Sequence, residues 1–446
     1  MRNLIYFLLA TLLFSCREYL DVKPDKKLVV PSDFLEAQSI LNHYLFNIGY
    51  PGFGEVASDD YYLETTDWQA AGTIAEKNAY LWNPDVFNAS PRNDWSFTYE
   101  KIYYANLVID GIEQGSITGS CDLVKNDILG QAYFFRANSF YSLLQLFSKH
   151  WDSTSASKDL GVPLRLTADF NVKVGRSSVE ESYNQLIRDL SNAVNLLNET
   201  TTAKTRPDRQ AALALMARVF LTLGNYKEAL IYSDRALTIR NELTDYNELN
   251  ATLAFPFAPL NKEVIWHSTL NTPRILYAPT LKISKELLDL YSQEDLRLSL
   301  FFLDNSDGSK SFKGSYNGSS VLFNGLSISE LYLIKAECLV RLGLEEQAKE
   351  TLDILRAHRM KNNLNSVSSK LESSDLLELI IMERRKELLF RGLRWTDLRR
   401  LNKIPEFAKV LERKIGNETF TLRPDGDRYV FKIPEDVIRM SGIEQN

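Results

Sequence analysis

The sequence predicts a mostly α-helical fold built from paired helices, with long irregular loops and a small β-hairpin near the C-terminus. Three observations support this prediction. Apolar residues recur at helical spacing in several segments, and in two of these a glycine divides the segment into a helix pair. A stretch near the C-terminus alternates apolar and polar residues around a turn. At 446 residues, the chain is long enough to bury a large core.

The helix-pair pattern occurs twice. In residues 328–359, apolar residues recur at helical spacing on both sides of Gly343, which marks the end of the first helix. Residues 211–239 repeat the arrangement around Gly224, and their series G-x-Y-x-x-A-x(6)-A is the tetratricopeptide signature. Small residues at these positions let two helices approach closely. The two segments together predict a tetratricopeptide-like helical-repeat scaffold.

The first sixteen residues have the pattern of a lipoprotein leader. A positive charge at Arg2 precedes an eleven-residue apolar run, which is shorter than the ~20 residues that span a bilayer. The run ends in LFSC, which resembles a lipobox, so Cys16 is predicted to be acylated; a plain secretory leader is the alternative. The predicted order is a signal peptide over residues 1–15, a lipidated N-terminus and tether over 16–31, and a single body over 32–446.

Four helices are predicted before the first helix pair. One begins after Ser32-Asp33, a second starts at Trp95, a third occupies residues 127–151, and a fourth follows Ser178. A glutamate three residues after Ser178 completes the sequence pattern of a capping box. These helices are expected to pack together ahead of the repeats.

Three segments lack helical periodicity and are predicted to be loops. Residues 47–96 are rich in aromatic and polar residues, which favours a functional segment over a disordered one. Residues 247–281 contain one predicted strand at 263–268, and residues 304–320 are rich in glycine, serine and asparagine.

The predicted C-terminal hairpin has its turn at Pro424-Asp425-Gly426. Phe420 and Leu422 alternate with polar residues on one side of the turn, and the apolar residues of 429–433 alternate on the other.

Composition excludes several functions. The balance of 52 Lys and Arg against 58 Asp and Glu gives a net charge of −6, which argues against a nucleic-acid partner. The three cysteines and four histidines are far apart, so no disulfide framework, metal site or cofactor is predicted. The sequence contains no G-x-S-x-G hydrolase elbow, no Walker nucleotide-binding loop and no H-E-x-x-H zinc-protease motif. We therefore predict that the chain is not an enzyme.

Residues 382–401, MERRKELLFRGLRWTDLRRL, carry the most specific motif. Their arginines alternate with acidic residues, which predicts internal ion pairs and not a phosphate site. The run E-R-R-x-E-L-x-F-x-G-x-R-W-x-D-L-R-R follows an E-x-Y-L-x-x-A-E-x-x-x-R-x-G helix, and together they resemble the SusD/RagB family of outer-membrane nutrient-binding lipoproteins. The resemblance extends from about Cys16 to Asn446.

This resemblance implies a lipid-anchored protein of the outer membrane that faces the exterior. It implies capture of an oligosaccharide or polysaccharide and delivery to a SusC-like TonB-dependent transporter, over which the protein closes. Because some relatives bind peptides, a peptide cargo is the first alternative. A surface glycosidase that uses Asp59 and Asp60, or a scaffold that binds only proteins, are the other two.

The candidate ligand-binding residues come from composition. A sugar presents flat C–H faces and hydroxyl edges, so its binder needs exposed aromatic rings beside amides or carboxylates. The segment 53–95 contains both, and Trp68 is the leading candidate because its neighbours are polar. The full candidate set is Tyr61, Tyr62, Trp68, Tyr80, Trp82, Asp59, Asp60, Asp67, Gln69 and Asn83, with Trp266 and Tyr277 from a later loop.

Overall fold

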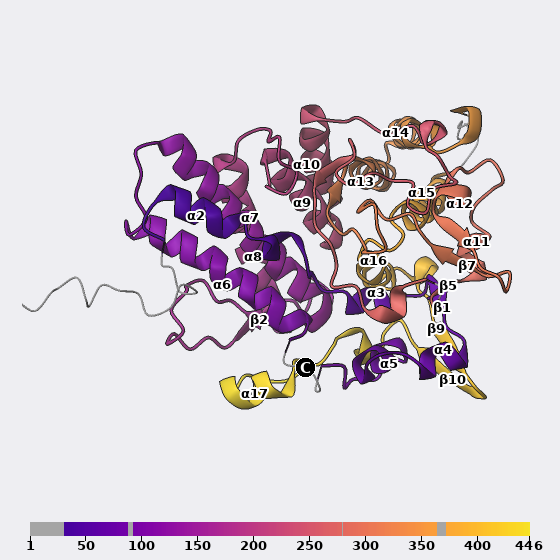
Figure 1. Cartoon of the computed structure of the whole chain (residues 1–446), viewed down its shortest axis with the longest axis horizontal. Helices are drawn as coiled ribbons and strands as arrows, with labels where there is room; N and C mark the ends of the chain where they lie inside the picture. The colour runs from indigo at the N-terminus through magenta and orange to yellow at the C-terminus, as the bar shows by residue number, and fades with distance from the viewer. Residues whose placement is uncertain (1–30, 88–91, 279, 364–371) are drawn as a thin grey trace, which may run out of the picture.

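The computed structural model describes residues 31–87, 92–278, 280–363 and 372–446. Within these residues the chain is mostly helical and its strands form small two-stranded sheets, which confirms the predicted fold class. Figure 1 shows the long helices across the upper part of the molecule, and the short helices and strands around α4 and β9 at the lower right. The predicted signal peptide, Cys16 and the tether up to residue 30 lie outside the described residues.

Four helices pack together in the N-terminal part of the chain, and they are α2 (Phe34–Leu41), α6 (Asp94–Glu113), α7 (Asp122–Phe147) and α8 (Val179–Leu196). Asp33 caps α2, and Ser178 caps α8 through the predicted capping box. From Ile128 onward nearly every residue of α7 is buried, because α2, α6 and α8 pack around it. The structure begins α7 five residues before the predicted start at 127.

Two antiparallel helix pairs follow, and they are α9 (Arg209–Thr222) with α10 (Tyr226–Ile239), and α13 (Ile328–Arg341) with α14 (Glu345–Ala357). Gly224 and Gly343 adopt φ of +70° and +77°, a left-handed conformation that glycine enters at little cost. Ala229 and Ala348 are fully buried where the paired helices approach each other. Helix α10 packs against α13, so the two pairs form one layer.

The motif-bearing segment forms α15 (Ser373–Glu387) and α16 (Arg394–Leu401). The turn between them is tight, with φ of +54° at Phe390 and +74° at Gly392. Positive φ is costly for a bulky residue, so the surrounding packing must hold Phe390 in place. The Phe390 ring packs against Phe312 and Tyr61, which ties the turn to two short strands that are distant in sequence.

The segment predicted as an irregular loop over 47–96 is more regular than expected. It contains the short helices α3 (Phe53–Ala57), α4 (Thr65–Gln69) and α5 (Ile74–Tyr80) and the strand β1 (Tyr61–Tyr62). Each helix is too short to show a helical period, because two turns or fewer give at most two repeats of the pattern. The segment is therefore a string of short elements that pack on the body.

The strands pair antiparallel over long sequence separations or across short turns. The pairs are β1 with β5 (Lys282–Ile283), β2 (Leu160–Pro163) with β3 (Arg176–Ser178), β4 (Val264–Trp266) with β8 (Leu326–Ser327), β6 (Phe302–Asp304) with β7 (Lys310–Phe312), and β9 (Leu411–Ile415) with β10 (Glu418–Leu422). The short helices α11 (Lys285–Leu288), α12 (Arg297–Leu300) and α17 (Glu435–Ser441) complete the fold.

The C-terminal hairpin exists, but the predicted turn is wrong. The hairpin β9–β10 turns at Gly416-Asn417, where Gly416 has φ of +60°. Residues 424–426 do form a turn, yet the chain after them leaves the hairpin and enters the core. The Phe431 N–H donates to the Leu146 carbonyl, and Phe431 and Ile433 are buried. Their alternation therefore reflects burial against α7 and α16 and not strand pairing.

None of the helices in the described part of the chain combines the length and hydrophobicity that a bilayer crossing requires.

Candidate functional site

The candidate ligand-binding residues fall into two groups by exposure. Six are buried or nearly so and have internal partners: Asp59, Asp60, Tyr61, Tyr80, Trp82 and Trp266. The other six are at least partly exposed: Tyr62, Asp67, Trp68, Gln69, Asn83 and Tyr277. The first group was predicted wrongly, because these side chains have no surface to offer a ligand.

Three of the buried aromatic residues enclose an arginine. The guanidinium of Arg413, on β9, lies 3.8 Å from the ring centroid of Tyr80, 4.8 Å from that of Trp82 and 5.3 Å from that of Tyr61. The Trp82 Nε1–H donates to the Ala57 carbonyl at 2.9 Å. Their polar ends are thus used inside the fold, and the aromatic density of this segment serves to bury a cation.

Asp59 and Asp60 bind the arginines of the motif segment. Asp59 lies 2.6 Å from the Arg394 Nε and 2.8 Å from the Lys409 Nζ, and Asp60 lies 2.7 Å from the Arg385 Nε. Burial opposes ionisation of Asp59, but these cations outweigh it and hold the pKa of Asp59 well below its usual value. The two carboxylates therefore join the N-terminal segment to α15 and α16. The glycosidase alternative loses its proposed acid and base.

Trp266 is a core residue. Its ring centroid lies 5.0 Å from that of Phe134 on α7 and 5.8 Å from that of Tyr50, and its side chain is 1 % exposed. The strand β4, on which it sits, was predicted correctly, but both ends of the tryptophan are enclosed because α7 passes beneath the strand.

Four of the exposed candidates lie on or beside α4, on a surface that we call the α4 face: Tyr62, Asp67, Trp68 and Gln69. Trp68 lies on α4 with one side packed on the core and its Nε1 3.4 Å from the Lys77 carbonyl. Tyr62 is 39 % exposed on β1, and its neighbour in the β1–β5 register is Lys282. Tyr277 is half-buried, five residues before Lys282. Asn83 is exposed beyond the C-terminal end of α5.

Lys282 lies at the centre of the acidic groups of this face. Its Nζ is 2.7 Å from Asp307 and 3.9 to 4.0 Å from Glu64 and Asp67. The Asp307 hydrogen bond is the main cause that raises the pKa of Lys282. The ammonium therefore stays charged and holds the tip of the β6–β7 hairpin against α4. Rings, carboxylates, an amide and a cation thus share one surface.

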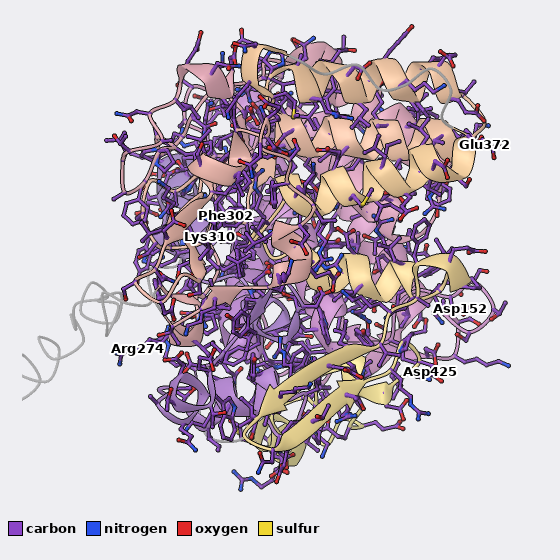
Figure 2. All side chains as sticks on the ribbon, turned by 90° about the vertical axis from the view of Figure 1, so that its right-hand side faces the viewer. Asp152, Arg274, Phe302, Lys310, Glu372 and Asp425 are labelled. Atoms are coloured by element: carbon purple, nitrogen blue, oxygen red, sulfur yellow. The ribbon has the colours of Figure 1, made fainter. Side chains whose placement is uncertain are left out.

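Two further basic residues at this face were missed by sequence reasoning. The Lys77 Nζ lies 5.7 Å from the Trp68 ring centroid and donates to the Gln69 carbonyl at 2.6 Å. Arg274 is exposed, and its Cδ lies beside Gly72, which follows α4. Figure 2 shows Arg274 at the lower left margin of the molecule, across that view from Asp152. The Ile275 N–H donates to the Glu76 carboxylate on α5 at 3.2 Å, which brings Arg274 here, and the sequence carries no signal for this contact between distant residues.

The arginines of the motif segment do not form a phosphate site. We call the group Glu263, Asp295, Arg297, Arg359, Glu383, Lys386 and Glu387 the charged core. Arg359 is fully buried, and its Nη2 lies 2.8 Å from Glu263 and 2.9 Å from Glu387. Arg297, also fully buried, lies 2.7 Å from both Asp295 and Glu383. Within the motif segment itself, Arg384 lies 2.9 Å and Arg400 lies 2.7 Å from Asp397, so the predicted internal ion pairs are observed.

The described residues contain no group of three or more His, Cys, Asp or Glu side chains placed to hold a metal ion. Cys338 is fully buried on α13. The α4 face presents aromatic rings beside carboxylates, an amide and ammonium groups.

Two family models match the chain. The first, described as "Starch-binding associating with outer membrane", matches residues 18–221, and the second, described as "SusD family", matches residues 312–439. The first description names starch binding, in agreement with the expectation of a binding protein.

Relatives and solved structures of the same kind match over nearly the whole chain. SusD-like protein P2 of Formosa agariphila is 24% identical over 85% of this chain and 84% of its own. A SusD superfamily protein from Bacteroides thetaiotaomicron superposes with a TM-score of 0.76 at 24% identity, covering 93% of this chain and 99% of that one. A laminarin binding SusD-like protein superposes with a TM-score of 0.66 at 18% identity, covering 92% and 98%. These structures have the same fold as this chain.

Proposed function

We propose that this chain, which belongs to the SusD/RagB family, binds a nutrient glycan at the outer membrane and delivers it to a SusC-like TonB-dependent transporter. The description of the first family model supports outer-membrane association and glycan binding. The laminarin binding relative supports a glycan cargo in this fold.

The observation that carries the site assignment is the composition of the α4 face. Trp68 and Tyr62 expose ring surface within a group of carboxylates and amides that Lys282 draws together. Sugar C–H groups pack on such rings, and sugar hydroxyls donate to carboxylates and accept from an ammonium.

The α4 face is tested by affinity electrophoresis of a soluble chain that begins at Arg17, through gels that contain laminarin, starch and other polysaccharides. We expect one or more gels to retard the protein, and Trp68→Ala to abolish the retardation. The matched control is Trp151→Ala, because Trp151 is also a partly buried tryptophan but lies away from the α4 face. Its neighbour in the sequence, Asp152, is on the opposite side of the view in Figure 2 from Arg274. If the gel still retards Trp68→Ala and no longer retards Trp151→Ala, the assigned site is contradicted. If no gel retards the wild-type protein, the glycan cargo is contradicted.

The anchor and the partner are proposed from the leader and the family. Cys16 is the proposed lipidation site, and metabolic labelling with a palmitate analogue should mark the wild-type protein but not Cys16→Ala. Mild detergent extraction of outer membranes should co-purify a TonB-dependent transporter with the wild-type protein. Absence of such a transporter under conditions that retain the lipidated protein would argue against delivery.

A further inference from the structure

The loop that joins β2 to β3 exposes a phenylalanine ring on the surface of α6. The Phe170 side chain is 72 % exposed, and its ring centroid lies 4.7 Å from that of Tyr103 on α6, with 24° between the ring planes. Leu166 and Val172, from the same loop, are also exposed. Helix α6 lies at the left of Figure 1 and α4 at the lower right, so this apolar patch is separate from the α4 face. An exposed patch with a ring held in a stack is typical of a binding surface.

The backbone of this loop is tied to α6 at two points. The Asn106 Nδ2–H donates to the Arg165 carbonyl at 2.9 Å. One turn further along α6, the Asp110 carboxylate accepts from the Ala168 N–H at 2.8 Å. Phe170 is therefore presented by a loop that already has a fixed conformation, and a ligand that packs on it loses little free energy to ordering of the loop.

A cavity of about 420 Å³ lies beside the ring pair, between this loop and the C-terminal half of α6. Leu107, Asp110 and Gln114 line it from α6. These three residues follow Tyr103 at helical spacing, so they continue the side of the helix that carries this ring. Asp169 lines the cavity from the loop. Because small-molecule sites have volumes of about 300–1,000 Å³, the ring pair borders a cavity of ligand size.

Each carboxylate of this cavity has one oxygen to offer to a ligand. In the described part of the chain, Asp110 uses one oxygen for both of its hydrogen bonds to the loop, and Asp169 uses one for both of its bonds from Asn171. The second oxygen of each can accept from a hydroxyl. The two rings stack on each other and leave one flat face of Phe170 to solvent, whereas a cation site needs rings on several sides. A flat ring beside carboxylate acceptors matches the C–H face and hydroxyl edge of a sugar.

We propose that this surface, which we call the α6 face and define by Tyr103, Asp110, Asp169 and Phe170, is a second glycan-binding site of the chain. A sugar ring packs on Phe170, and its hydroxyls donate to the two carboxylates. The site is separate from the α4 face and does not depend on it. It exposes one large ring where the α4 face offers two, so it binds more weakly and does not by itself retard the protein in a gel.

A second site changes how a long glycan is held. One polysaccharide chain that contacts both faces binds more tightly than to either face alone, because the second contact forms within the same complex. This consequence rests on the proposed function of the α4 face, whereas binding at the α6 face does not.

Hydrogen exchange tests the α6 face on the chain from Arg17, with a starch hexasaccharide and a laminarin hexasaccharide at millimolar concentration as probes. We expect at least one probe to slow exchange of the amides of residues 164–172 by about threefold or more, both in the wild-type protein and in Trp68→Ala. Phe170→Ala should remove the effect, and it should fold normally because the ring is exposed. The matched control, Phe255→Ala, removes an exposed phenylalanine from the loop between α10 and β4 and should leave the effect intact.

Three results would overturn the proposal. The first is unchanged exchange of residues 164–172 with both probes, because packing on a ring selects only weakly among sugars. The second is protection that disappears in Trp68→Ala, which would show that binding at the α4 face is transmitted to this loop. The third is a concentration-dependent dimer in sedimentation that Phe170→Ala dissociates, which would assign the surface to a second copy of this chain. Each of them leaves the proposed function standing, because retardation in the gel depends on Trp68.

Discussion

The charged core and the α4 face use the same residue types in opposite ways. In the charged core, Arg359 and Arg297 are fully buried, and each contacts at least two carboxylates within 3.2 Å. On the α4 face, Lys282 contacts one carboxylate closely and two more loosely, and rings lie exposed beside them. Buried charges must be fully paired because desolvation is costly, whereas surface charges can leave hydrogen-bonding capacity for a ligand. Complete pairing of a buried charge therefore indicates a structural role, whereas partial pairing of a surface charge leaves the residue able to bind a ligand.

The sharpest way to break this contrast is to remove a buried arginine. Arg359→Ala leaves Glu263 and Glu387 buried without their main cation, so we expect a loss of about 3–5 kcal/mol in the free energy of unfolding. Urea denaturation followed by circular dichroism measures it. Lys285→Ala, which removes an exposed pair with Asp289, should cost less than about 0.5 kcal/mol. A loss below about 1 kcal/mol for Arg359→Ala would contradict the assigned role.

A second prediction concerns Glu55, whose carboxylate accepts from the Gly392 N–H at 2.8 Å in the turn before α16. Burial, followed by the nearby Asp60, raises the pKa of Glu55 from 4.5 to about 8. Between these values the folded chain keeps a proton that the unfolded chain has released, so stability falls as pH rises, by up to about 1.4 kcal/mol per pH unit. Glu55→Gln should flatten this slope.

The slope is best measured between pH 5 and 7. Burial lowers the pKa of Lys101 from 10.5 to about 7. Above pH 7, Lys101 is therefore protonated in the unfolded chain but not in the folded chain, and its contribution makes stability rise with pH, which opposes the effect of Glu55. Asp94, whose pKa burial raises to about 6, acts in the same direction as Glu55 and remains in the variant. A wild-type slope that Glu55→Gln leaves unchanged would show that Glu55 is ionised in the folded chain.

The smallest expected effects distinguish two neighbouring tyrosines on β1. The Tyr61 hydroxyl donates to the Val56 carbonyl at 2.8 Å in the core, so Tyr61→Phe should cost about 1 kcal/mol of stability and leave glycan binding intact. Tyr62 is exposed, so Tyr62→Ala should change stability by less than about 0.5 kcal/mol and weaken retardation in the polysaccharide gel. The opposite pattern would place the ligand elsewhere.

The long helices were predictable because their signals are local. Ser178 caps α8, and Gly224 and Gly343 end the first helices of the two pairs at the expected positions. The C-terminal hairpin was misplaced because Tyr429, Phe431 and Ile433 alternate as a strand does, although packing against Trp395 and Phe87 causes that alternation. The Gly416-Asn417 pair was the local signal for the true turn.

The candidate site was predictable as a segment but not as a set of side chains. Trp68 and Tyr62 are on the α4 face, whereas Trp82 and Tyr80 from the same segment enclose Arg413, more than 300 residues away. Lys282 reaches the face through the β1–β5 pairing, and Arg274 through the hydrogen bond of Ile275 to Glu76. Contacts of such sequence separation leave no periodic pattern in short elements, so composition alone could not sort the rings.

By itself, the sequence determined the helical class, the two repeat pairs and the internal pairing of the motif arginines, because caps, glycine stops and alternating charges act over a few residues. Only the tertiary structure decided which aromatic rings face solvent and which carboxylates form ion pairs with arginines. Exposure depends on what other segments cover, and burial of a charge depends on a partner that the fold must bring from far along the chain.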